Sequence, residues 1–352
     1  MTKKKRKNKP YIKILPVIGV LIAGMAVIGG YFGYLLVFKP NVNIEEEFTH
    51  FYIPTGSNYQ QVRDLLEANQ LLKNPQTFHW VAQRKNYPSL VRAGRYRIQR
   101  GMSNNALVNL LRSGRQDPVN VTFNNIRSRE QLAGVITRNL EADSASVLEI
   151  MNNGEKMRTY GLNRETAKLL FIPNTYEFFW NTSAEQLFER MYREYRTFWN
   201  EGRRQKAEAI GMSPVEVGIL ASIIRLESSK PDEMPRIAGV YINRLRRNIP
   251  LQADPTVIFA IGDFSIRRVL YRHLTYDSPY NTYKYRGLPP GPISLPEPYV
   301  IDAVLNFETH DFLFFSAHYD FSGYHVFART YREHRVNARR YQNVLNQRNI
   351  MR

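Results

Sequence analysis

The sequence predicts an α+β protein with a single N-terminal transmembrane helix, a small α+β module and a larger mixed α/β domain. Three observations point to this class. An apolar run without charges stands near the N-terminus, two strand-turn-helix segments resemble each other 45 positions apart, and helical periodicity dominates from residue 120 onward. With 352 residues the chain is long enough for two or three domains.

The apolar run covers residues 14–38 and follows a basic tail, residues 1–13, with seven Lys or Arg and no acid. About 20 apolar residues are enough to span a bilayer core. A cleaved signal peptide has a shorter core and a small-residue cleavage site, neither of which is evident here. The positive-inside rule then predicts a cytoplasmic tail and an exported remainder. The alternative is a long, uncleaved export signal.

Composition limits the possible chemistry. The chain has no cysteine, which excludes disulfides, thiolate catalysis and Cys-ligated metals. The net charge is +18, and removing the seven basic residues of the tail leaves 18 − 7 = +11. Such a charge suits anionic partners, for example cell-wall polymers or lipid headgroups. The membrane anchor and the even spread of the charge argue against nucleic acid.

Residues 39–118 are predicted to form the small α+β module. Each of its two similar segments reads as a strand, a glycine turn and a helix. The matched positions are Ile53, Gly56, Val62, Leu65 and Leu66 in the first and Ile98, Gly101, Leu107, Leu110 and Leu111 in the second. A weaker third copy begins at Val121, without the glycine. The alternative is convergent patterning with no repeat.

Residues 119–352 are predicted to form the larger domain. Its clearest signal is a helix start at Ser213, where a capping box coincides with Pro214 at the first helical position. Beyond Pro250 the chain is rich in loops, and residues 329–349 read as a basic helix.

The candidate catalytic residue is Glu227, near the end of the helix that starts at Ser213. At about 100° per residue, Glu227 falls between Leu220 and Ile223 on the apolar face, whereas Arg225 falls on the opposite side. A carboxyl group on an apolar face is desolvated, which raises its pKa and favours the protonated form that a general acid needs. The alternative is a solvated glutamate at the helix end.

Polar and aromatic residues downstream are candidates for sugar binding, because a sugar presents apolar ring faces and many hydroxyl groups. The candidates are Asn243, Gln252, Asp254, Thr256, Tyr280, Asn281, Tyr283 and His325. Each could equally belong to a structural turn network, and His325 could hydrogen-bond within the core. Seven histidines without a ligand pattern predict no metal site.

The chain also resembles the YceG-like endolytic murein transglycosylase family over nearly its whole length. The shared motifs are "IPTGSNYQQVRDLLEANQLL", "AGRYRIQRGMSNNALVNLLRSG", "LASIIRLES", "AGVYINRLRRNIPLQADPTVIFAIGD", "SPYNTYKYRGLPPGPIS" and "GYHVFARTYREH". The resemblance implies a LysM-like module at residues 39–118, a transglycosylase domain at residues 119–352 and a catalytic role for Glu227. The sequence departs from the family pattern at Arg225, where an acid is usual, and at Asn174, where Asp is frequent.

The resemblance implies a lyase that cuts the β-1,4 bond between N-acetylmuramic acid and N-acetylglucosamine in nascent glycan strands. Such an enzyme would leave 1,6-anhydro ends, terminate strand elongation and need no cofactor. The resemblance further implies peptidoglycan strands as substrate, peptidoglycan synthases as neighbours, and an inner-membrane location with the catalytic domain outside the cytoplasm. Two alternatives stay open at this point: a non-catalytic cell-wall scaffold, and a hydrolytic muramidase that uses Glu227 with Asp254.

Overall fold

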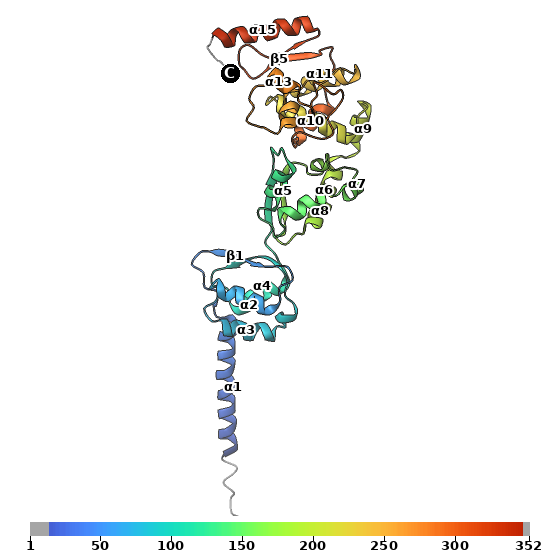
Figure 1. Cartoon of the computed structure of the whole chain (residues 1–352). Helices are drawn as coiled ribbons and strands as arrows, with labels where there is room; N and C mark the ends of the chain where they lie inside the picture. The colour runs from blue at the N-terminus through green and yellow to red at the C-terminus, as the bar shows by residue number, and fades with distance from the viewer. Residues whose placement is uncertain (1–13, 348–352) are drawn as a thin grey trace, which may run out of the picture. The chain divides into compact units, whose positions relative to one another are not determined.

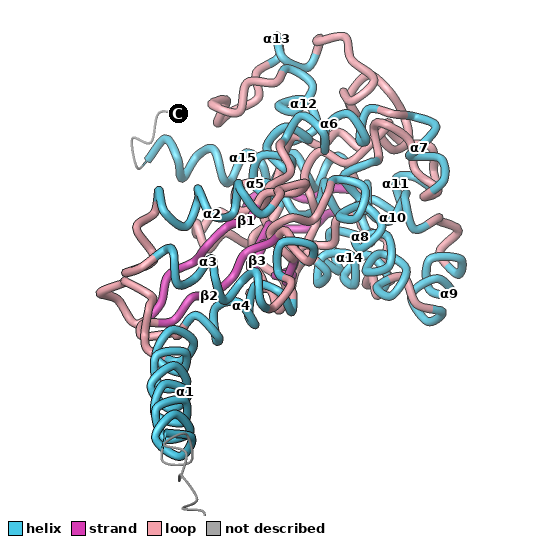
Figure 2. The backbone as a smooth tube through the Cα atoms, turned by 90° about the horizontal axis from the view of Figure 1, so that it is seen from below, coloured by secondary structure: helices cyan, strands magenta, loops and turns pink. Residues whose placement is uncertain are grey.

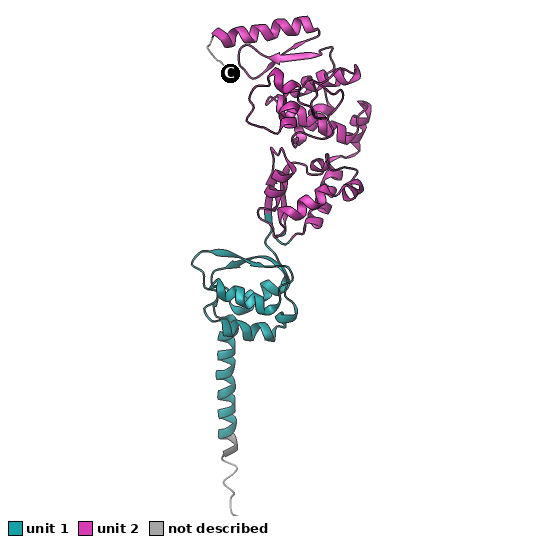
Figure 3. Ribbon diagram, in the orientation of Figure 1, with its two compact units in different colours: residues 1–119, 179–181 teal, residues 120–178, 182–352 magenta. Residues whose placement is uncertain are grey.

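A computed structural model describes residues 14–347, with side chains from residue 17 onward, and the fold is α+β as predicted (Figure 1). The predicted basic tail, residues 1–13, lies outside the described residues. The chain divides into two compact units (Figure 3). Unit 1 comprises residues 1–119 and 179–181, and unit 2 comprises residues 120–178 and 182–352.

Helix α1 (Ile14–Phe38) is the predicted apolar segment. Its stretch from Val17 to Phe38 has a mean hydropathy of 2.1, and none of it is buried inside the protein. The helix is therefore long and apolar enough to cross a membrane, which is compatible with a single-pass anchor.

Unit 1 is built around the antiparallel pair β1 (Phe48–Ile53) and β2 (Gly94–Gln99), whose register runs from Phe48 opposite Gln99 to Ile53 opposite Gly94. Its helices are α2 (Tyr59–Ala68), α3 (Pro75–Arg84), the 3₁₀ turn η2 (Tyr87–Ser89) and α4 (Asn104–Ser113). Side chains from these strands and helices form one hydrophobic core.

The two predicted strand-turn-helix segments are β1–α2 and β2–α4. Both turns use a glycine in the left-handed region, Gly56 at φ 80° and Gly101 at φ 75°, where a side chain would be strained. Both helices begin at a side-chain N-cap, Asn58 and Ser103, which are also 45 positions apart. The weaker third copy has the same form, because Asn125 supplies a positive φ of 49° in place of glycine.

The first part of unit 2 contains the pair of β3 (Val119–Phe123), of which only Val119 belongs to unit 1, and β4 (Asn174–Phe178). The helices that accompany this pair are α5 (Arg129–Thr137), α6 (Ser144–Asn152), α7 (Gly154–Thr159), the 3₁₀ turn η3 (Ala167–Leu170) and α8 (Ala184–Phe198). Rings from both strands hold the part together, since Phe123 stacks on Tyr176 with centroids 5.6 Å apart.

The second part of unit 2 is mostly helix and loop, as Figure 2 shows by colour. Its elements are α9 (Glu201–Ala209), α10 (Pro214–Glu227), α11 (Met234–Arg246), α12 (Asp254–Ile261), α13 (Tyr271–Leu274), α14 (Pro298–Leu305), β5 (Phe314–Ala317), β6 (His325–Ala328) and α15 (Tyr331–Gln347). Helix α10 is central, because α11, α12 and α14 all pack against it. The β5–β6 hairpin carries α15, the predicted basic helix.

Helix α10 begins and ends for reasons that the sequence contains. Ser213 Oγ accepts from Glu216 N, and the Glu216 side chain accepts from Ser213 N, so the predicted capping box is present. Eight consecutive residues, 217–224, are buried. The helix stops at Glu227, because Ser228 has an extended backbone.

Candidate active site

Glu227 is the last residue of α10, which packs against α11. Tyr241 of α11, whose side chain is buried, donates a hydrogen bond of 2.6 Å from its hydroxyl to Glu227 Oε1. No hydrogen bond to the other oxygen, Oε2, is found within residues 14–347. One carboxyl oxygen is thus held by the protein while the other remains available.

The surroundings of Glu227 favour its protonated form. Burial raises the pKa of Glu227 to about 7, and the nearby negative charge of Asp254 adds to this rise, while the hydrogen bond from Tyr241 opposes it. Glu227 keeps partial exposure because it lines a cavity, yet protein surrounds it on most sides. A carboxylic acid with this pKa is present in both protonation states near neutral pH, as proton transfer in both directions requires.

Arg225 does not neutralise Glu227. Its Nε lies 2.7 Å from Glu297 Oε2, at the residue that precedes α14. The structure therefore places Arg225 and Glu227 on different faces of α10, as the helical spacing predicted. The guanidinium of Arg225 links α10 to the residue that precedes α14.

A cavity of about 550 Å³ opens at Glu227. Its lining comes from α10 to α13, from the loops around Gln252 and Tyr283, and from β5, β6 and α15. The lining residues are Glu227, Tyr241, Arg244, Leu251, Gln252, Asp254, Tyr271, Leu274, Tyr283, Phe314, Phe315, Ser316, Ala317, His325, Tyr331 and His334. Aromatic rings mixed with hydrogen-bonding groups are typical of a pocket for a polar ligand with apolar faces.

Four of the predicted binding residues line this cavity together with Glu227: Gln252, Asp254, Tyr283 and His325. Tyr283 donates from its hydroxyl to Asp254 Oδ1 at 2.5 Å. Burial raises the pKa of Asp254, and the hydrogen bond from Tyr283 opposes this rise. Gln252 accepts through Oε1 from the guanidinium of Arg244.

His325 is held from outside the cavity by Glu233, which is buried. Glu233 Oε2 lies 2.8 Å from His325 Nδ1, and Oε1 accepts from the His325 backbone N–H at 2.7 Å. With its proton on Nδ1, His325 donates a hydrogen bond to the Glu233 carboxylate, so Nε2 is free to accept a hydrogen bond from a ligand.

The other four predicted residues do not line the cavity. Asn243 donates to the backbone carbonyls of His310 and Phe312, and so ties α11 to the segment before β5. Thr256 is buried and hydrogen-bonds to Thr282 and to the carbonyl of Ala253.

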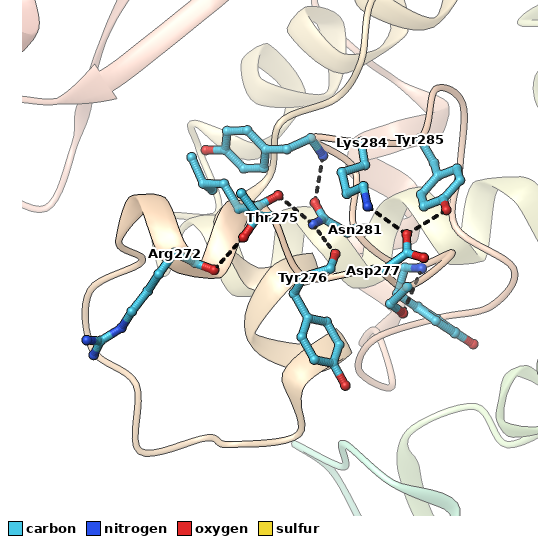
Figure 4. Close-up of polar contacts among 11 residues, drawn as sticks. Arg272, Thr275, Tyr276, Asp277, Asn281, Lys284 and Tyr285 are labelled. Atoms are coloured by element: carbon cyan, nitrogen blue, oxygen red, sulfur yellow. Dashed lines mark hydrogen bonds and ion pairs between the residues drawn. The ribbon is translucent and has the colours of Figure 1, made fainter.

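Tyr280 and Asn281 organise the loop that carries Tyr283. The ring of Tyr280 packs on Phe259 of α12 with centroids 4.9 Å apart. Asn281 Nδ2 donates to the carbonyls of Leu274 and Tyr276, and its Oδ1 accepts from the backbone N–H of Tyr283 (Figure 4). One buried amide therefore connects the end of α13 with a residue of the cavity wall.

Sequence reasoning missed Tyr241 and Arg244. They lie three residues apart on α11 and so share a helix face, whereas the chosen Asn243 faces elsewhere. A tyrosine within an apolar helix face could have drawn attention, because a buried hydroxyl needs a hydrogen-bond partner. The aromatic residues of β5 and His334 of α15 carried no comparable signal.

Within residues 14–347, no group of three His, Asp or Glu side chains could hold a metal ion. The polar groups that line the cavity at Glu227 include carboxyl, phenol, guanidinium, amide and imidazole groups.

Comparison with known proteins gives consistent similarities. The model of the YceG-like family matches residues 51–340. An endolytic murein transglycosylase of Bacillus subtilis is 28% identical over 336 residues, which cover 90% of this chain and 91% of that protein. An endolytic murein transglycosylase of Streptococcus pneumoniae is 28% identical over 82% of this chain but only 58% of its own length. The crystal structure of a yceG-like protein from Listeria monocytogenes is similar with a TM-score of 0.53 and 28% identity, and covers 82% of this chain and 98% of that one.

Proposed function

Because the chain belongs to the YceG-like family, we propose that it is an endolytic murein transglycosylase. It would cut the β-1,4 bond between N-acetylmuramic acid and N-acetylglucosamine within nascent glycan strands and leave 1,6-anhydro ends. The observation that carries the proposal is Glu227, a carboxyl group with a pKa of about 7 on the wall of a 550 Å³ cavity. The names of the relatives agree with it.

In the first step Glu227 acts as a general acid. The protonated carboxyl group gives its proton from Oε2 to the glycosidic oxygen, and the bond from that oxygen to C1 of the muramoyl residue breaks. Tyr241 donates to Oε1, so Oε1 takes the carbonyl role and the proton resides on Oε2. Positive charge develops at the sugar, and the departing strand leaves with a hydroxyl group.

In the second step the resulting carboxylate acts as a base. It accepts the proton of the C6 hydroxyl while O6 bonds to C1, which closes the 1,6-anhydro ring. The proton returns to Glu227, and no water is consumed. A well-oriented intramolecular hydroxyl can have an effective molarity of about 10⁵ M or more, so this step needs no second carboxylate.

The remaining predicted residues divide into two proposed roles. Gln252, Tyr283 and His325 line the cavity and would hydrogen-bond to sugar hydroxyl and acetamido groups. Asn243, Thr256, Tyr280 and Asn281 would position these residues, because their polar atoms or rings are already engaged with the protein.

A hydrolytic muramidase is the second candidate. Asp254 lines the same cavity, and its charge acts on Glu227. A second carboxylate could activate water or attack the sugar, as in glycosidases with paired carboxylates. The only support for the scaffold alternative was the departure from the family pattern at Arg225. Because Arg225 pairs with Glu297, it does not neutralise the charge of Glu227.

The location proposed for this activity is the inner membrane, with α1 as a single-pass anchor, the basic tail in the cytoplasm and the catalytic residues outside it. Residues 39–118 would serve as a LysM-like glycan-binding module, and residues 119–352 as the catalytic domain. Peptidoglycan synthases would lie nearby.

The test uses the full chain in detergent, incubated with uncrosslinked glycan strands, followed by mass spectrometry of the new ends. The variants are Glu227→Gln and, as a matched control, Glu208→Gln on the exposed surface of α9. The proposal expects anhydro ends from the wild type and the control, and none from Glu227→Gln. Reducing ends would favour the muramidase, and no new ends from any sample would favour the scaffold.

A further inference from the structure

Two tyrosines on the cavity wall are unusually exposed. Tyr271 is 90% exposed and Tyr331 is 62% exposed, although both line the cavity at Glu227. Other exposed tyrosines of unit 2, such as Tyr285 and Tyr299 at 45% each, lie away from it. A single exposed aromatic ring is common on protein surfaces. Two of them at one cavity that also holds a perturbed acid call for an explanation.

The two tyrosines come from different elements of the cavity lining. Tyr271 is the first residue of α13, which packs against α12. Tyr331 is the first residue of α15, which packs against β5 and β6. A ligand that extends across the lining from α13 to α15 would therefore meet both rings.

The backbone at both tyrosines is fixed by local hydrogen bonds. At Tyr331, Glu333 Oε2 accepts from Thr330 N, and Glu333 N donates to Thr330 Oγ1 at 3.2 Å, which is a capping arrangement. At Tyr271, the backbone N–H of Leu270 donates to His273 Nδ1 at 3.0 Å. The far end of α13 is tied to the next loop by Asn281 (Figure 4).

The ring of Tyr331 extends an aromatic surface that continues into the cavity. Its centroid lies 6.0 Å from that of Phe314, and Phe314 in turn stacks on His334 at 5.4 Å. Exposed aromatic area of this kind is unfavourable in water, and covering it with an apolar face lowers the free energy. The C–H face of a pyranose ring is such a face, while its hydroxyl groups can reach the polar residues of the cavity lining.

We propose that Tyr271 and Tyr331 are stacking platforms for sugar rings on opposite sides of the bond at Glu227. This inference rests on the proposed function and adds two substrate-binding residues to it. With one platform on each side, the cavity holds a glycan strand that continues in both directions. Cleavage then falls within a strand and not at its end.

Binding is tested in the Glu227→Gln background, where the full chain in detergent can hold glycan without cutting it. Uncrosslinked strands of defined length are the probe. Tyr271→Ala and Tyr331→Ala should each raise the Kd about tenfold, whereas Tyr271→Trp and Tyr331→Trp should keep it close to that of the parent. Tyr299→Ala, an exposed tyrosine of α14 away from the cavity, is the matched control and should change nothing. Unchanged binding in both alanine variants would overturn the inference.

The positions of the cuts test the two-sided arrangement. With active protein and oligosaccharides of fixed length, Tyr271→Ala and Tyr331→Ala should raise KM more than they lower kcat, and should shift the cuts toward opposite ends. A shift toward the same end in both variants would contradict the arrangement. If the wild type makes no anhydro ends, the proposed function fails, and the binding assay still decides whether the tyrosines hold sugar.

Discussion

The two polar neighbours of Glu227 act on its pKa in opposite directions. The hydroxyl of Tyr241 donates to the carboxyl group and lowers the pKa, whereas the charge of Asp254 raises it. Burial is the largest cause and outweighs Tyr241, which is why the pKa settles at about 7. The acid therefore depends on a balance that single substitutions can disturb.

The first prediction concerns the pH profile of kcat, which should fall as pH rises through about 7 because the acid loses its proton. Tyr241→Phe removes the stabilisation of the carboxylate, so the alkaline limb should move to higher pH. Asp254→Asn removes the repulsion, so that limb should move to lower pH. Steady-state rates between pH 5 and 9 check both shifts, and a shift in the same direction for both variants would refute this account.

The second prediction concerns stability. The pKa of Glu227 is about 7 in the folded chain against an ordinary value of 4.5, so unfolding releases a proton between these two values. Wild-type stability therefore falls as pH rises from about 4.5 to about 7. Glu227→Gln has no titrating group at this position, so the variant does not lose stability in this way. The variant should gain up to about 3 kcal/mol relative to the wild type above pH 7.

Thermal melts at pH 4 and pH 8 measure this gain as a difference in Tm that appears only at the higher pH. An equal difference at both values would mean that the carboxyl group is not perturbed by the fold.

At the scale of single elements, the sequence predicted α10 well because its determinants are local. The capping box, the proline at the first helical position and the apolar periodicity all lie within the helix, and together they set the face on which Glu227 lies. The partner Tyr241 could not be predicted in the same way, since it depends on how α11 packs against α10. The same limit explains Asn281, whose bonds to Leu274 and Tyr276 reflect a loop path that no periodicity encodes.

The ion pair between α10 and α14 gives the third prediction. Arg225→Ala should lower the free energy of unfolding by about 1–3 kcal/mol, because it leaves the half-buried Glu297 without its partner. It should leave kcat nearly unchanged, since Arg225 does not contact Glu227. Denaturant unfolding and kinetics check both statements. The double variant Arg225→Ala/Glu297→Ala should lose less stability than the sum of the single variants, and full additivity would deny the coupling.

The fourth prediction concerns the loop after α13, which carries Asn281 and Tyr283. Asn281→Ala removes two donated bonds and one accepted bond of a buried amide, which should cost about 2–3 kcal/mol. Loss of order at α13 and Tyr283 should raise KM and make residues 263–285 more sensitive to limited proteolysis. Asn306→Ala, an exposed asparagine at the end of α14, is the control and should show neither effect.

At the scale of the whole molecule, the features that one sequence segment encodes were predictable and the assembly of distant segments was not. The uncharged run of residues 14–38 predicted α1, and the two related segments predicted β1–α2 and β2–α4. The cavity combines residues from 227 to 334, so its complete lining depends on tertiary packing. Of the eight predicted binding residues, four line the cavity: Gln252, Asp254, Tyr283 and His325. They are interspersed along the sequence with the four that do not, so sequence position alone does not separate the two groups.

The most direct test of the central claim is digestion by the full chain in water labelled with heavy oxygen. If Glu227 directs the C6 hydroxyl to C1, the new muramoyl ends carry no label and are lighter than reducing ends by one water molecule. These products should be absent with Glu227→Gln. Labelled reducing ends would contradict the account, because they would show that water and not the sugar's own hydroxyl attacks C1.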